Sequence, residues 1–372
     1  MTEPLSSPVA PGPASALGGV RVAARRVGSA LLFAVLPAAV VISMFAVAIA
    51  GGPLALDFHQ ELYPQAKELL DGRNPFPEAI WPPFAAAVAA PFTIFPPGVA
   101  DVLIAVTGPL CIGAALWLVG VRDWRVYGVA AMWPQVIAEI RISHLTPLLC
   151  LLLAVAWRYR EAEVKAGVAL GMAGAIKFFV WPVGIWLLAT RRTKAAAVAA
   201  VLAAGSLLLV LPFAGLDDYL RTVFRVSREF DQDSYSSYGL LTQLGVGSTA
   251  ARTVTIAFGL ALLVATWRRC NFALAVAAAL VLSPIVWLDY YALAIVPLAV
   301  ARPRLSAVWF VPLLTWGLPS SGIAADAIFG VGRVLLAFAV VLIVASRPPV
   351  LVVASRVAGS HTLEPRRGQG SF

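Results

Sequence analysis

The sequence has 372 residues, of which 60% are hydrophobic and only 13% are charged, and its mean hydropathy is +0.86. So few polar residues cannot cover two or three soluble domains, and the composition therefore predicts an integral membrane protein. The net charge of +9 would suggest a nucleic-acid partner in a soluble protein. Here the basic residues cluster in short loops between apolar runs, which marks membrane topology and predicts no nucleic-acid partner. The cysteines form no CxxC pair, and no P-loop or strand-linked GxGxxG motif occurs, which argues against a zinc site and a nucleotide-binding fold.

Residues 1–27 are rich in Pro, Ser, Ala and Gly and end close to a basic group, RVAARR. This composition predicts a disordered cytoplasmic tail. The apolar run that follows, 28–52, is longer than the apolar core of a secretory signal, and the GGP at its end is a poor cleavage site. We therefore expect a retained transmembrane helix whose amino end faces the cytoplasm.

The segment 53–82 interrupts the apolar character with several acidic residues, which predicts an external loop. Within it, a short surface helix is expected over 59–70, ending at Gly72 as a left-handed C-cap. Asp57 stands at the start of this loop. Its carboxylate is placed either to cap the helix or to act as a general base, and position alone does not separate the two interpretations. Trp81, at the end of the loop, is either part of a site or an interfacial anchor, the commoner role.

Further membrane-spanning segments are predicted at 83–96, 100–120, 165–190, 195–213, 250–267, 306–319 and 327–345. Two paired stretches, 126–139 with 144–157 and 272–286 with 291–301, are apolar but shorter than the ~20 residues of a full crossing. Each pair is either a re-entrant hairpin or two short tilted helices. The predicted fold class is an all-α polytopic membrane protein with about twelve segments. Its membrane domain covers 28–346, and a cytoplasmic tail follows at 347–372.

The distribution of charge supports one orientation in the plasma membrane. With a cytoplasmic amino end, the basic loops around Arg191, Arg268 and Arg302 fall inside, together with the tail. The acidic loop at 214–249 then falls outside with 53–82. The exception is RYREAEVK at 158–165, because this count places a mildly basic segment outside.

Lys177 lies near the middle of a predicted span, between GMAGAI and FFVWP. An ammonium group within lipid costs ~2.5–3.5 kcal/mol, so it needs a partner or a polar cavity. Pro182 is expected to break the helix one turn after Lys177 and to open the backbone toward such a cavity. A functional role is favoured over snorkelling, because half a bilayer exceeds the reach of the side chain.

Other polar residues stand where short segments meet. Glu139, Arg141 and His144 lie at the first junction; they contribute to a site if the pair is re-entrant, whereas Arg141 is an ordinary cytoplasmic cation if the pair crosses. Asp289 and Tyr290 lie at the second junction and are either an external cap or part of a site. In the loop 214–249, Arg225 and Arg228 belong to a stretch whose spacing predicts an amphipathic helix, and they either anchor it to headgroups or bind a lipid phosphate.

Several of these segments form a recognisable series. In chain order they are Asp57 after the first span, YPQAKELLDGRNPF, WPPF, AGVALGMAGAIKFFVWP and SPIVWLDYYALAIVPLA. Together they resemble glycosyltransferase family 87, which comprises GT-C-fold membrane enzymes of actinobacteria, including polyprenyl-phosphate-mannose-dependent mannosyltransferases and related arabinofuranosyltransferases. By this resemblance, Asp57 matches the catalytic aspartate of the family and Lys177 its membrane-embedded lysine.

The resemblance implies an inverting transfer of mannose or arabinofuranose from a polyprenyl-phosphate donor to a cell-envelope glycolipid or glycan on the external face. Asp57 would act as general base, while Lys177 and an arginine would meet the charge of the leaving phosphate. No cofactor is expected, and metal independence is predicted because no DxD triplet stands in the first external loop. Substrate contacts are expected from His59, Gln60, Tyr63, Arg141, His144, Lys177, Arg225, Arg228, Asp289 and Tyr290.

The chain departs from the family at two places. Ser143-His144 stands where the family often has Gly-Gln, and SPIVWLDYY lacks the histidines of SPISWDHH. These departures place a histidine-assisted step in question. The alternative function is a transporter or lipid flippase that uses Lys177 and Asp289 as a coupling pair. Transporters usually show matching broken helices in repeated halves, whereas the two short pairs here are unequally placed, so a glycosyltransferase is favoured.

Overall fold

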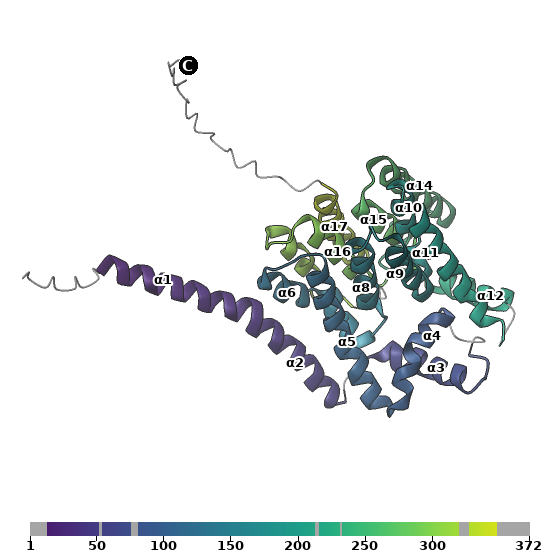
Figure 1. The fold of residues 1–372 in the computed structure, drawn as a ribbon, viewed down its shortest axis with the longest axis horizontal. Coiled ribbons are helices and arrows are strands. Elements are labelled where there is room, and N and C mark those ends of the chain that lie inside the picture. Colours follow the sequence, from purple (N-terminus) through teal and green to yellow (C-terminus); the bar gives the residue numbers. More distant parts are fainter. Residues whose placement is uncertain are drawn as a thin grey trace, which may run out of the picture.

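The computed structural model describes residues 13–51, 54–75, 81–212, 216–230, 233–319 and 327–347. Within these ranges every regular element is a helix, which confirms the predicted all-α class (Figure 1). The α-helices are α1 Pro13–Ala30, α2 Leu36–Ile49, α3 Tyr63–Leu70, α4 Pro83–Ala89, α5 Pro97–Leu118, α6 Trp124–Ala131, α7 Pro134–Ile142, α8 Thr146–Arg158, α9 Glu163–Ile176, α10 Pro182–Ala189, α11 Thr193–Ser206, α12 Leu216–Phe230, α13 Ser237–Gln243, α14 Ser248–Arg269, α15 Phe272–Leu282, α16 Ile295–Ala301 and α17 Ala327–Ser346. Short 3-10 or π turns extend or join several of them, among them Phe58–Leu62, Phe178–Val180, Leu288–Ala294 and Ala307–Thr315.

Five helices in the described part of the chain are long and apolar enough to cross a membrane: Val22–Val47, Pro97–Leu118, Thr193–Val210, Ser248–Arg269 and Ile328–Ser346. Five shorter apolar helices lie among them: Pro83–Ile94, Thr146–Arg158, Phe178–Ala189, Phe272–Leu282 and Leu288–Ala301. The chain is therefore a multi-helix membrane protein. The count of twelve segments and the GT-C fold stay predictions.

The first apolar helix begins earlier than the sequence predicts. Helix α1 starts at Pro13, so residues 13–27, expected to be disordered, are helical. Alanine and arginine favour helix, and propagation from the apolar run adds one hydrogen bond for each residue that it orders. Together α1 and α2 form one long helix at the side of the bundle, with α1 standing away from it (Figure 1). Gly128 of α6 contacts this helix, and a Cβ atom there would lie 1.9 Å from the carbonyl oxygen of Phe33.

In three pairs of helices, the first helix begins and the second helix ends at the same end of the molecule. We call this the basic end because it carries Arg192, Arg269 and Arg302. The pairs are α6/α7 with α8, α9 with α10, and α15 with α16. At this end Arg192 lies 2.6 Å from Glu161, and Asn271 donates to the carbonyl of Ser346 over 2.8 Å. A hollow there is lined by residues from the ends of five helices or loops, including Val119, Trp157, Asn271, Ala301 and Ser346. The breaks between the two halves of each pair lie together at the other end.

These pairs correct two predicted spans. The stretch 165–190 is not one span, because Lys177 separates α9 from α10 and the chain returns to the basic end. The stretch 83–96 does not lead away from the external loop, because Phe95 at its far end accepts a hydrogen bond of 3.0 Å from the Tyr63 hydroxyl of that loop. Together the two corrections move the loop 158–165 to the end that holds Arg192. The one basic segment that contradicted the charge pattern therefore fits it.

Small residues let α9 and α11 approach closely. A Cβ atom at Gly167 would lie 2.6 Å from the carbonyl oxygen of Ala195, and one at Gly171 would lie 2.8 Å from Cβ of Leu202. This glycine pair, four residues apart, is the spacing by which membrane helices pack backbone to backbone. The contact fixes the direction of α9 and so the position of Lys177 at its end.

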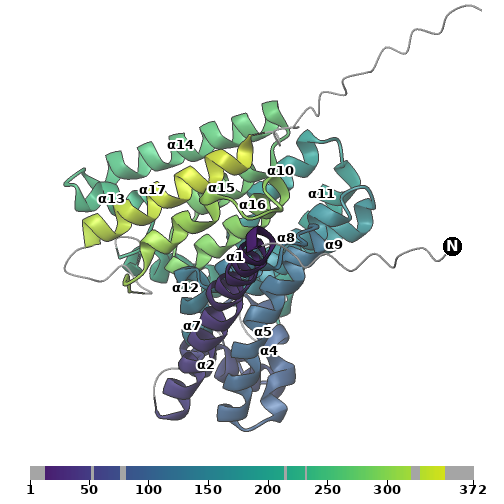
Figure 2. The same cartoon turned by 90° about the vertical axis from the view of Figure 1, so that its left-hand side faces the viewer.

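In the turned view, α14, α15 and α17 occupy one half of the molecule, whereas α2, α4 and α5 occupy the other (Figure 2).

Candidate active site

A cavity of about 370 Å³ lies where the three helix pairs break. Helix α12 covers it with Val223, Val226, Ser227 and Phe230, which recur at the spacing of one helix face. The predicted amphipathic helix in the 214–249 loop is thus present and forms the roof of this cavity. The chemically active side chains that line it are Asp57, Glu61, Trp81, His144, Lys177 and Tyr290. We call this the catalytic cavity.

Asp57 reaches the cavity from the turn that precedes α3. Ala55 adopts a left-handed conformation, with φ of 49°, and its N–H donates to the carbonyl of Ile140 over 3.4 Å. This contact holds the turn against α7. The Asp57 carboxylate makes no capping hydrogen bond to the helical turn that follows and instead contacts Nε2 of His144. Asp57 thus occupies the N-cap position of this turn, but its side chain is directed to His144 and not to the helix backbone.

His144 lies between two carboxylates. Its neighbours Ser143 and Leu145 both have positive φ, 59° and 62°, so the chain turns sharply between α7 and α8 and presents the imidazole inward. Nε2 contacts Asp57, and Nδ1 lies 3.1 Å from Oδ1 of Asp289. An imidazolium donates at both nitrogens, so it satisfies both carboxylates at once. The segment SPIVWLDYY lacks the family's histidines, yet a histidine from another helix pair contacts both aspartates.

Asp289 is the last residue in this chain of contacts, which runs from Asp57 through His144. It is 0% exposed, and its second oxygen accepts a 2.7 Å hydrogen bond from the hydroxyl of Thr146. Tyr290, the next residue, packs edge-on against the His144 ring and stacks on Phe179 with 4.9 Å between ring centroids. The break before α16 therefore positions one acidic and one aromatic side chain around His144.

Lys177 stands at the break between α9 and α10. The sequence predicted a break one turn later; instead Lys177 itself is extended, and Pro182 begins α10, where its missing N–H costs nothing. The residue is 6% exposed, and Nζ has no hydrogen-bond partner within the described ranges. Nζ lies 3.9 Å from the ring centre of Tyr290 and 4.5 Å from that of Trp81. A buried ammonium with unused donors, held over two aromatic faces in a cavity, is suited to an anion.

Glu61 and Trp81 complete the wall beside Asp57. Trp81 is 5% exposed and its Nε1 donates to Glu61 over 3.0 Å, so it is not a simple interfacial anchor. Burial raises the pKa of Glu61, and the nearby charge of Asp57 adds to this effect. The Glu61 carboxyl therefore holds a proton more readily than usual.

Glu139, His144 and Asp289 are the group that would suit a metal ion, since one ligand atom from each lies within 4.8 Å of the others. However, Asp289 already accepts from His144 and Thr146. The Lys177 ammonium lines the same cavity as His144. A cation at this place would have to displace the contact between His144 and Asp289 and then lie near a second positive charge.

Six further residues predicted for the site lie elsewhere. Arg228 lines a neighbouring cavity, while Gln60, Arg141 and Arg225 are exposed and line neither cavity. Nδ1 of His59 lies 2.8 Å from Asp101, and the Tyr63 hydroxyl is used on Phe95. Conversely, the sequence reading missed Glu61, Thr146 and Phe179. Glu61 follows Asp57 by four residues in a helical stretch, a spacing that puts both on one face and would have identified it.

Comparison with known proteins identifies the family of the chain. The model of glycosyltransferase family 87 matches residues 79–288, more than half of the chain, a range that includes Trp81, His144 and Lys177. No curated protein and no solved structure matches the chain. The five helices able to cross a membrane, the cavity that joins a carboxylate to a buried lysine, and the family match lead to one assignment: the chain belongs to glycosyltransferase family 87.

Proposed function

We propose that this membrane glycosyltransferase transfers a sugar, mannose or arabinofuranose, from a polyprenyl-phosphate donor to a cell-envelope glycolipid or glycan on the external face of the plasma membrane. The observation that carries the proposal is that the Asp57 carboxylate and the Lys177 ammonium line one cavity. One group is a base and the other a cation for phosphate, which are the two functions that such a transfer needs. Outside the cytoplasm nucleotide sugars are not supplied, so the donor is a lipid phosphate.

The proposed step is a single inverting displacement. Asp57 removes the proton from the acceptor hydroxyl as its oxygen attacks the anomeric carbon. The bond between that carbon and the phosphate oxygen breaks on the opposite face, and the electron pair leaves with polyprenyl phosphate. Lys177 meets the charge that develops on this oxygen, and because it is buried, its effect is larger than it would be in water.

His144 and Asp289 support Asp57 in this proposal. Asp289 is fully buried and fixes one side of the imidazole, whose other nitrogen contacts Asp57. This orders the base and offers a positive charge beside it until it accepts the proton. The arrangement is similar in logic to catalytic triads, where a buried aspartate orients a histidine.

The test is sugar transfer from a synthetic polyprenyl-phosphate sugar, measured on purified protein. Asp57→Asn keeps the size of the side chain but cannot take the proton, so transfer should fall by at least ~10²-fold. Glu61→Gln is the matched control, because its amide oxygen still accepts from Trp81, and transfer should fall by less than ~10-fold. Near-normal transfer by folded Asp57→Asn protein would remove this residue from the mechanism.

We also propose that transfer needs no divalent cation, because Lys177 supplies the charge for the leaving phosphate. Transfer should therefore continue at an unchanged rate when the purified enzyme is assayed in excess EDTA. A loss of transfer that added Mg²⁺ or Mn²⁺ restores would contradict this proposal. Glu139, His144 and Asp289 would then be examined as its ligands.

A further inference from the structure

Asp57 lies in a single helical turn that is closed by a backbone hydrogen bond. The N–H of His59 donates to the carbonyl of Ala55 over 2.8 Å, and Asp57 is the middle residue of the turn between them. The next residue, Phe58, is 0% exposed, and its ring packs edge-on against that of Phe92. The position of the Asp57 carboxylate therefore depends on how the two ends of this turn are held.

The two ends of the turn are held by two different helices. At the first end, the N–H of Ala55 donates to the carbonyl of Ile140 in α7. At the second end, Nδ1 of His59 lies 2.8 Å from Oδ2 of Asp101 in α5. Because a carboxylate only accepts, the imidazole donates through its Nδ1–H, whether the ring is neutral or charged. A turn tied at one end is free to pivot about that tie, whereas ties to two helices fix its orientation.

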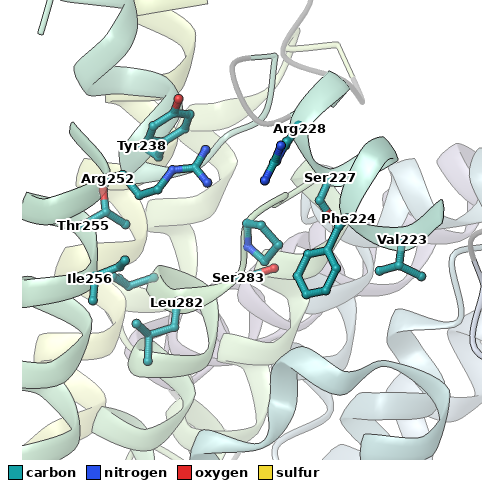
Figure 3. Close-up of a pocket in the computed structure, with 12 residues that line it drawn as sticks. Val223, Phe224, Ser227, Arg228, Tyr238, Arg252, Thr255, Ile256, Leu282 and Ser283 are labelled. Atoms are coloured by element: carbon teal, nitrogen blue, oxygen red, sulfur yellow. The ribbon is translucent and has the colours of Figure 1, made fainter. Parts of the chain in front are cut away.

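Asp101 is a largely buried carboxylate outside the catalytic cavity. Its side chain is 12% exposed, and its second oxygen has no hydrogen-bond partner among the residues that the structure describes. A carboxylate removed from water is costly unless it is paired, so the contact with His59 stabilises it. Neither residue lines the catalytic cavity or the neighbouring cavity of about 390 Å³ between α12 and α14 (Figure 3). Any effect of these two residues on the reaction is therefore transmitted through the turn that carries Asp57.

We propose that His59 and Asp101 form a positioning pair that keeps Asp57 directed at the acceptor hydroxyl; this rests on the proposed role of Asp57 as general base. The turn brings Asp57 to Nε2 of His144, which comes from the junction after α7. The tie of Ala55 to α7 keeps the turn beside that junction, and the tie of His59 to α5 stops the turn from rotating the carboxylate away from the cavity. A displacement of about 1 Å at a reacting group costs on the order of 10²-fold in rate, so even a partly loosened tie is measurable.

Steady-state kinetics of sugar transfer by the purified full-length protein test this inference. His59→Ala and Asp101→Ala should each lower kcat about tenfold, while KM for donor and acceptor changes less than about threefold, because the cavity walls are untouched. His59→Asn should keep kcat within about threefold of wild type, since its amide nitrogen replaces Nδ1 as the donor to Asp101. The double variant should be no slower than the slower single variant, because both changes remove the same contact. Additive losses, or an unchanged kcat in His59→Ala, would overturn the inference.

Tyr63→Phe is the matched control. It removes the 3.0 Å hydrogen bond from the Tyr63 hydroxyl to Phe95, which ties α3 to the segment ahead of α5 but lies outside the turn from Ala55 to His59. Its kcat should stay within about twofold of wild type, although its melting temperature should fall about as much as that of His59→Ala. An equal loss of kcat in Tyr63→Phe would show that any loosening of this region slows the enzyme, which would overturn a specific role for the positioning pair.

Hydrogen–deuterium exchange separates this inference from the proposed function. The amides of residues 56–60 should exchange about tenfold faster in His59→Ala than in wild type, and close to the wild-type rate in His59→Asn, because the amide donor restores the tie. If this difference is seen but the wild type transfers no sugar from the polyprenyl-phosphate donor, the proposed function is wrong, while the anchoring of the turn by His59 and Asp101 stands. If the wild type transfers sugar but exchange and kcat are the same in His59→Ala, the positioning role is wrong and the proposed function stands.

Discussion

His144 owes its position to backbone conformation as much as to side-chain contacts. The left-handed residues on either side of it cost free energy in a non-glycine residue, and they are retained at the point where the imidazole meets two carboxylates. Tyr290 packs edge-on against the imidazole ring. The left-handed turn therefore positions the imidazole between the two carboxylates.

We expect His144→Gln to lower kcat about 10- to 100-fold. Glutamine can hydrogen-bond to one aspartate but cannot carry positive charge beside Asp57. The Asp57 carboxylate would then be less ordered, and its negative charge would have no cation beside it. Because His144 acts through Asp57, KM for donor and acceptor should stay within about threefold of wild type. Steady-state kinetics and the pH profile of kcat provide the measurement. A fall in melting temperature with an unchanged kcat and pH profile would assign His144 a purely structural role.

Individual site residues differ in how far the sequence reveals them. Lys177 and Asp57 could be predicted because a charged residue in or beside an apolar run has few explanations. The pairing of His144 with Asp289 could not, because the two residues are 145 positions apart and nothing local indicates that their helix junctions meet. Trp81 was ambiguous for the same reason, since its role depends on Glu61 and Lys177, which reach it only in the folded chain.

At the scale of helices, the main result is that short segments work as pairs. The stretch 165–190 reads as one apolar span because the residues on both sides of Lys177 have similar hydropathy. Its division depends on Lys177, whose ammonium is stabilised only where the helix opens to a cavity. Composition therefore predicts that a segment is apolar and helical, but where it reverses is decided by the cavity formed with other helices.

Asp123 joins the start of α6 to the loop around Leu305 at the basic end. Its carboxylate caps α6 by accepting from the N–H of Arg125, and it also accepts from the N–H of Leu305 over 3.0 Å. Asp123→Ala should lower the free energy of unfolding by ~1–2 kcal/mol. Asp123→Asn, which retains a capping oxygen, should lose less than half of that amount.

The same residue predicts a dependence on pH. The Arg125 side chain lowers the pKa of Asp123 to about 2. Because this is below the ordinary value of about 3.9, the stabilisation is complete above that value and is lost as the pH falls toward about 2. The melting-temperature difference between wild type and Asp123→Ala should therefore shrink between pH 7 and pH 3. A constant difference would show that the carboxylate charge is not what joins these elements.

At the scale of the whole molecule, the basic loops and the catalytic cavity lie at opposite ends. The loops that carry Arg192, Arg269 and Arg302 meet at one end, while Asp57, His144 and Lys177 meet where the pairs break. From the positive-inside rule we expect the basic end to lie in the cytoplasm and the catalytic cavity toward the external face. This is the side on which the proposed lipid-linked donor would be used.

The final prediction tests this orientation with single cysteines. Cys270 is exposed and Cys111 and Cys150 are buried, so Cys270→Ser gives a background of low reactivity. Leu70→Cys, on the exposed side of α3, should react with a membrane-impermeant maleimide in intact cells. Ala162→Cys, exposed in the loop before α9, should react only after permeabilisation, because the ion pair between Glu161 and Arg192 holds this loop at the basic end.

The Ala162→Cys variant separates two topologies that the amino-acid sequence alone does not. If 83–96 and 165–190 each crossed the membrane once, position 162 would face outside and react in intact cells alongside position 70. If each of these stretches instead begins and ends on the same side of the membrane, as in the structure, position 162 lies inside while position 70 lies outside. Labelling of both positions in intact cells would contradict the paired arrangement of α9 and α10, and with it the placement of Lys177 at a helix break that faces the external catalytic cavity.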